Sequence, residues 1–148
     1  SPIWSPHTVR DIAAIERVQK FFTKNLKGLR NKTYQEDYLD IKHTNLEIRR
    51  SFSDLVFLYK ILHGSLDANL VALFPSSNTC SIVSLRRHPF QLLLPKPRSD
   101  LLKFNFIYRT SKLWNSLPYH ITSTESIATF KKLLLPYLCK HIFTLNIV

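Results

Sequence analysis

The chain has 148 residues, of which 21 are Lys or Arg and 10 are Asp or Glu, so its formal charge is +11. This length favours one domain with a sizeable core, and an apolar content of 45% excludes a disordered chain. Two cysteines exclude a disulfide framework, no apolar run approaches the roughly 18 residues that span a bilayer, and no signal-peptide pattern opens the chain.

The first residue is serine and the chain contains no methionine, so we interpret it as a piece of a longer open reading frame. We expect one helical domain over residues 1–148, located inside the cell, in cytoplasm and nucleus. A strongly basic chain predicts a polyanionic partner and gives no reason to expect a membrane.

The charge is segregated along the chain. Residues 1–32 carry seven basic and two acidic side chains (+5), residues 33–75 carry four and six (−2), and residues 76–148 carry ten and two (+8). A surface that follows a nucleic-acid backbone would need this distribution. The alternative is that lysines merely solvate helix surfaces.

The first predicted helix lies within residues 1–32. Ser5 suits its cap, Pro6 its first turn and Gly28 its end. Helical steps of 7, 3, 4 and 3 place five basic residues in one stripe: Arg10, Arg17, Lys20, Lys24 and Lys27. Arg30 extends this stripe past the helix end, and an ordinary solvated face remains the alternative.

Capping patterns predict the next two helices. Thr33 with Glu36 opens a short helix, and the same pattern at Thr44 opens a longer one that Gly64 closes. The longer helix is the best core candidate, because its apolar residues follow helical spacing: Phe52, Leu55, Tyr59 and Leu62. One or two helical turns are expected within residues 66–74.

Residues 75–100 are predicted to form an extended or hairpin-like insertion, because Pro89, Pro95 and Pro97 exclude a helix. Four basic residues bracket this stretch: Arg86, Arg87, Lys96 and Arg98. They suit contact with a nucleic-acid strand, and the alternative is that the stretch is a surface loop without such a contact.

Two more helices complete the prediction of about five. A fourth is expected from about residue 101 to 117, where Pro118 ends it, and a fifth from about 126 to 138, with Pro136 kinking or shortening it. Residues 142–148 are expected to form an apolar tail outside the core.

No pattern for catalysis stands out. Glu36, Asp37 and Asp40 cluster on one predicted helix, but early-helix acids already suit the helix dipole. The histidines are scattered, no nucleophile elbow exists, and two glycines leave no phosphate-cradling loop. We therefore expect no catalytic residue, metal, cofactor or small-molecule substrate. Cys139 is expected to be a small, buried or semi-buried hydrophobic residue rather than a reactive thiol.

Aromatic and basic residues alternate within 103–114, a mixture that can stack bases and hold phosphates. A core stripe is the better interpretation for Phe104, Ile107 and Trp114. Arg109 is the exception, and we expect it to contact nucleic acid.

An ordered set of short motifs resembles a known family. Trp4-Ser5-Pro6 is followed by Ile15-Glu16-Arg17-Val18-Gln19-Lys20-Phe21-Phe22-Thr23-Lys24, then by Tyr59-Lys60-Ile61-Leu62-His63-Gly64 and Trp114-Asn115-Ser116-Leu117-Pro118. This set, spread over about residues 4–138, resembles the region downstream of the reverse transcriptase domain in jockey/CR1-like non-LTR retrotransposons.

The resemblance implies a parent protein that is an RNA-directed DNA polymerase with an endonuclease. The paired-Asp motif of the polymerase is absent from this chain, so no enzymatic activity is expected of the fragment itself. In the family, this region is expected to help hold template RNA or target DNA against the polymerase domain.

The sequence thus predicts a helical accessory region that binds nucleic-acid backbone electrostatically. The alternatives are a structural module that packs on the polymerase thumb and a remnant of a decayed element. The residues predicted to contact nucleic acid are Arg17, Lys20, Lys24, Lys27, Arg30, Arg86, Arg87, Lys96, Arg98 and Arg109.

Overall fold

The computed structural model of the chain describes residues 5–25, 46–74, 90–94 and 96–145, without the side chains of residues 23, 24, 68 and 141–145. Its elements, in chain order, are α1 (Val9–Lys24), α2 (Leu46–Leu62), the 3-10 helix η2 (Ala68–Leu73), α3 (Asp100–Phe104), α4 (Phe106–Ser116), α5 (Tyr119–Thr122) and α6 (Ile127–Leu145). The described part is mainly helical and contains no strand, which confirms the predicted fold class. The predicted helix near 33–41 and most of the insertion near 75–100 lie outside the described residues.

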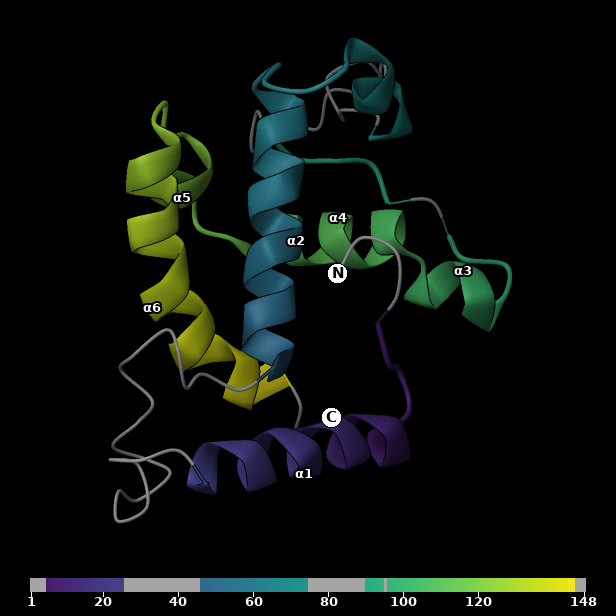
Figure 1. Cartoon of the computed structure of the whole chain (residues 1–148). Helices are drawn as coiled ribbons and strands as arrows, with labels where there is room; N and C mark the ends of the chain where they lie inside the picture. Colours follow the sequence, from purple (N-terminus) through teal and green to yellow (C-terminus); the bar gives the residue numbers. More distant parts are fainter. Residues whose placement is uncertain (1–4, 26–45, 75–89, 95, 146–148) are drawn as a thin grey trace.

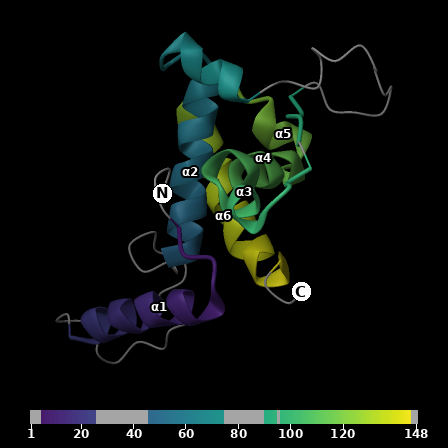
Figure 2. The same ribbon diagram turned by 90° about the vertical axis from the view of Figure 1, so that its right-hand side faces the viewer.

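Helix α2 is the centre of the structure. Helix α6 runs antiparallel beside it, α4 crosses α2, and η2 follows at the far end of α2 (Figure 1). Helix α1 crosses near the amino end of α2, away from the other helices (Figure 2). The central place of α2 follows from its sequence, because apolar side chains occur on more than one face of it.

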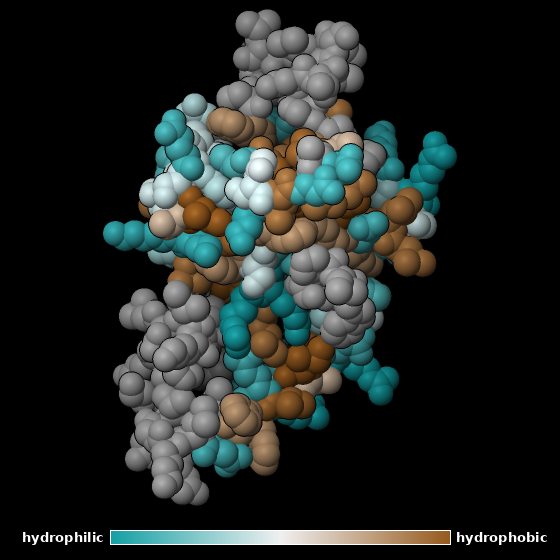
Figure 3. Space-filling model, turned by 45° about the horizontal axis from the view of Figure 1, so that its top comes forward, coloured by the Kyte–Doolittle hydropathy of each residue, from teal (hydrophilic) through white to brown (hydrophobic). Residues whose placement is uncertain are grey.

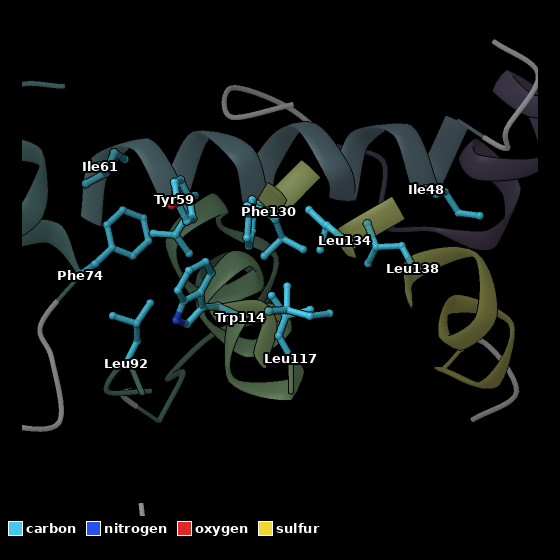
Figure 4. Close-up of a cluster of buried hydrophobic side chains, with 13 residues drawn as sticks. Ile48, Tyr59, Ile61, Phe74, Leu92, Trp114, Leu117, Phe130, Leu134 and Leu138 are labelled. Atoms are coloured by element: carbon cyan, nitrogen blue, oxygen red, sulfur yellow. The ribbon is translucent and has the colours of Figure 1, made fainter. Parts of the chain in front are cut away.

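The core forms where α2, α4 and α6 meet (Figure 4). The Tyr59 ring of α2 stacks on the Phe130 ring of α6 with centroids 4.4 Å apart. The centroid of the Trp114 ring of α4 lies 5.9 Å from that of Phe130. The buried apolar residues are Ile48, Leu55, Leu58, Tyr59, Ile61, Phe74, Leu92, Trp114, Leu117, Ile121, Phe130, Leu134 and Leu138. Of the core residues predicted on α2, Leu55 and Tyr59 are buried, whereas Phe52 and Leu62 are partly buried against the cluster.

Gly64 terminates α2 as predicted. Its φ is +66°, a left-handed conformation that glycine adopts without a Cβ penalty. The amide of Ser65 donates to the carbonyl of Lys60 at 2.9 Å, and the amide of Gly64 donates to that of Ile61 at 3.2 Å. These bonds satisfy carbonyls that the helix end would otherwise leave unpaired.

The start of α1 differs from the prediction. Thr8, not Ser5, caps the helix, since its Oγ1 accepts a hydrogen bond from the amide of Asp11 at 3.1 Å. Pro6 is buried ahead of the helix rather than in its first turn. The correct cap is the residue whose hydroxyl can reach the amides of the first turn, and Ser5 lies too early. Gly28, predicted to end this helix, lies outside the described residues.

The predicted helix over 101–117 is wrong as a single element. It is divided at Asn105, whose ψ of 149° is extended. The Asn105 side chain accepts from the amide of Ile107 at 3.0 Å and so caps α4, while Ser99 caps α3. Asparagine offers the backbone this local alternative to a continuous helix.

Two further differences concern proline. Pro118 ends α4 as predicted, but it also precedes α5, which the sequence did not predict. Pro136 lies inside α6, which continues to Leu145 rather than ending near 138. The helix bends in its last part (Figure 1), because proline lacks an amide donor and its ring clashes with the preceding turn. Burial of Leu138 beyond the proline offsets part of that cost.

Candidate nucleic-acid interface

Exposed cations line one face of α1. Arg10, Arg17 and Lys20 are all exposed, and helical spacing places them on one side. The opposite side holds the half-buried Ile12 and Ile15. Local sequence thus positions these cations, since apolar residues three apart turn toward the body of the protein and the basic ones turn away.

A second group of cations precedes and enters α3. Lys96, Arg98 and Lys103 are exposed, as the prediction for Lys96 and Arg98 requires. A ring contact links α3 to the segment before α1, because the rings of His7 and Phe104 lie 4.5 Å apart at 26°. The start of α1 and α3 lie on one side of the molecule (Figure 1).

Several predicted residues have no described side chain. Lys24 lies on α1, but its side chain is not described. The others lie outside the described residues: Lys27, Arg30, Arg86 and Arg87.

Arg109 does not belong to the exposed cationic surface. Its Nη2 lies 2.7 Å from Oδ2 of Asp54 on α2, and its side chain is 23% exposed against 2% for that of Asp54. The guanidinium also lies 6.0 Å from the centroid of the Phe106 ring. A buried carboxylate needs a charged, hydrogen-bonded partner. Arg109 therefore joins α4 to α2, a role that its aromatic and basic neighbours in the sequence did not indicate.

Glu16 is the polar residue at the contact between α1 and α2. Burial raises the pKa of its carboxyl, although the amides of Leu46 and Glu47 at the start of α2 and the cations Arg50 and Lys20 act in the opposite direction. No local pattern indicates this contact, since only folding brings Glu16 to the amino end of a distant helix.

The string Trp114-Asn115-Ser116-Leu117-Pro118 has a structural role in this chain. Trp114 Nε1 donates to the carbonyl of Phe90 at 2.8 Å. The Asn115 amide pairs with Leu92 twice: its Oδ1 accepts from the Leu92 amide at 2.9 Å and its Nδ2 donates to the Leu92 carbonyl at 2.8 Å.

The rest of the string continues this role. The hydroxyl of Tyr137 on α6 donates a hydrogen bond to the Ser116 carbonyl at 2.8 Å, and Leu117 is buried. The string therefore attaches residues 90–92 to α4, and α4 to α6.

The described residues contain no group of three or more His, Cys, Asp or Glu side chains placed to hold a metal. The carboxylates of Glu36, Asp37 and Asp40 lie outside the described residues. Cys139 is half-buried, as predicted, and burial raises the pKa of its thiol. A raised pKa disfavours the nucleophilic thiolate.

Hydrophobic side chains also reach the surface between polar ones (Figure 3). Among the described residues, none of the helices is both long enough and apolar enough to cross a membrane.

No protein-family model, curated protein or solved structure matches the chain.

Proposed function

We propose that the chain is a helical accessory domain from the region downstream of the reverse transcriptase in a non-LTR retrotransposon, and that it binds the backbone of RNA or DNA. The observation that carries the proposal is the exposure of two cationic groups, one along α1 and one before and within α3. These are Arg10, Arg17 and Lys20 on α1, and Lys96, Arg98 and Lys103 at α3. The retrotransposon origin rests on the motif resemblance.

The mechanism is electrostatic. Lysine and arginine that neutralise phosphates release condensed counterions, so affinity falls linearly with salt on a logarithmic scale. Engagement of about six phosphates corresponds to a slope of about −5. Phosphate contacts carry no direct sequence information, so the proposal concerns binding without sequence preference.

The test is a salt titration of the purified chain with labelled single-stranded RNA and duplex DNA. The double variant Arg17→Glu, Lys20→Glu should bind more weakly and show a shallower slope. Its matched control is Lys131→Glu, Lys132→Glu, which changes the same total charge at exposed residues of α6. Absence of binding at low salt by a folded sample, or equal losses in both variants, would contradict the proposal.

A second candidate function is favoured by the apolar row of α1. Val18, Phe21 and Phe22 are 69%, 72% and 64% exposed, and they lie on a side of α1 that the rest of the described structure does not cover. We propose the polymerase domain of the parent protein as the partner that covers this row, because large exposed apolar patches mark interaction sites.

This second candidate has its own test. The isolated chain should bind a hydrophobic dye, and Phe21→Ser, Phe22→Ser should reduce both dye binding and co-purification with the polymerase domain. Unchanged co-purification of that variant would contradict the packing function while leaving the salt titration as the test of nucleic-acid binding.

A further inference from the structure

Two aromatic side chains lie together at the surface without belonging to the core. The rings of Phe90 and Tyr119 have centroids 6.5 Å apart and an interplanar angle of 27°. Phe90 is 41% exposed and Tyr119 is 56% exposed. The core has aromatic side chains of its own, Tyr59, Trp114 and Phe130, each of which is buried.

The backbone on the Phe90 side of the pair is fixed. The Phe90 carbonyl accepts from the indole of the buried Trp114, and Leu92, two residues later, is held by both ends of the Asn115 amide. The segment that carries the ring is therefore attached to α4 by three hydrogen bonds within three residues.

The Tyr119 side is fixed as well. Tyr119 is the first residue of α5, directly after Pro118. Its carbonyl accepts from the amide of Ser123 at 2.9 Å and from the hydroxyl of Thr122 at 3.2 Å. Both rings thus stand on backbone that is ordered before any ligand arrives, which lowers the entropic cost of binding.

Near-parallel, exposed and preorganised rings suit a planar, aromatic ligand. Every nucleobase has a π-face, so stacking on protein aromatic side chains is tolerant of sequence. Bases within a duplex are already covered by their neighbours, whereas unpaired bases can be splayed onto such rings.

We propose that Phe90 and Tyr119 form a stacking platform for the unpaired bases of single-stranded RNA or DNA. This inference rests on the proposed function and deepens it: the cations hold the phosphates, and the platform selects single strands over duplex. Truncation of a base-stacking aromatic residue weakens binding by about 5- to 150-fold per base.

The experiment compares two labelled oligonucleotides that have the same number of phosphates, one with bases and one fully abasic. The native chain should bind the oligonucleotide with bases at least about fivefold more tightly. The double variant Phe90→Leu, Tyr119→Leu keeps apolar volume but removes both rings. It should bind the two oligonucleotides with equal affinity, without a change in the salt slope.

One control variant accompanies it. Tyr119→Phe keeps the ring and should bind like the native chain. Circular dichroism checks that each variant folds.

The outcomes separate the two proposals. The native chain could bind both oligonucleotides equally tightly and in a salt-dependent way, or the preference for bases could survive the loss of both rings. Either result overturns the stacking platform and leaves backbone binding in place. Failure to bind either oligonucleotide overturns both.

Photocrosslinking of the native chain provides a measurement that needs no variant. An oligonucleotide containing 5-iodouridine should crosslink to Phe90 or Tyr119, as mapped by mass spectrometry, and crosslinks confined to other residues would refute the platform.

Discussion

Replacing Asn115 with alanine removes the pair of hydrogen bonds that holds residues 90–92 against α4. The side chain accepts from the Leu92 amide at 2.9 Å and donates to the Leu92 carbonyl at 2.8 Å. Leu92 is 4% exposed, so water cannot readily replace the lost partner. Alanine at this position therefore leaves two buried backbone groups unsatisfied.

The size of the effect follows from those two groups. A buried donor or acceptor left without a partner costs about 1–3 kcal/mol, and a typical net hydrogen bond contributes about 1 kcal/mol. We expect Asn115→Ala to lower the free energy of unfolding by about 2–4 kcal/mol, because the segment can relax partly toward solvent. For a domain of this size, that loss corresponds to a decrease in Tm of roughly 4–16 °C.

Two measurements check the prediction. Urea denaturation followed by circular dichroism gives the free energy of unfolding, and hydrogen exchange reports whether the Leu92 amide loses protection. The control is Ser116→Ala, since the exposed Ser116 hydroxyl bonds only within its own helix, to the Leu113 carbonyl at 2.6 Å. An Asn115→Ala variant within about 0.5 kcal/mol of the native chain, with unchanged exchange at Leu92, would refute the reasoning.

Three further predictions concern other contacts. Arg109→Met should destabilise the fold by about 3–5 kcal/mol, because it removes the guanidinium that is ion-paired with the buried Asp54 carboxylate, whereas adding Asp54→Leu should recover most of the loss; additive losses in urea denaturation would contradict this. Glu16→Gln should stabilise the fold at pH 7. It should not do so when the pH is below 4.5, the pKa of the Glu16 carboxyl in the unfolded chain. Burial raises the pKa of Glu16, so the folded chain holds the proton more tightly and loses stability as pH rises through that pKa; a pH-independent difference in thermal denaturation would argue otherwise. Gly64→Ala should cost about 1–2 kcal/mol from the positive φ alone, since a Cβ there meets no atom within 4 Å, and Gly64→Asn should cost less; equal Tm values for the three chains would exclude this cause.

Much of the candidate interface could be expected from the sequence. Arg17 and Lys20 are exposed on α1 because a helix with apolar residues on one side turns its cations to the other. Lys96 and Arg98 are exposed beside prolines that prevent a helix. No local pattern indicates that α3 and the segment before α1 meet through His7 and Phe104, because that contact joins residues far apart in the chain.

The sequence by itself determined the features that depend on neighbouring residues: the helical class, the body of α2 and its end at Gly64. Only the tertiary structure decided the roles of Arg109 and of the Trp114-Asn115 pair. An arginine among aromatic residues is equally suited to bind phosphate and to pair with a buried carboxylate. Arg109 pairs with Asp54, which lies on a different helix. Likewise, Asn115 holds Leu92 because packing of Trp114 brings residues 90–92 alongside α4. Such partners are set by long-range packing, whereas local patterns report only the propensities of the residues that contain them.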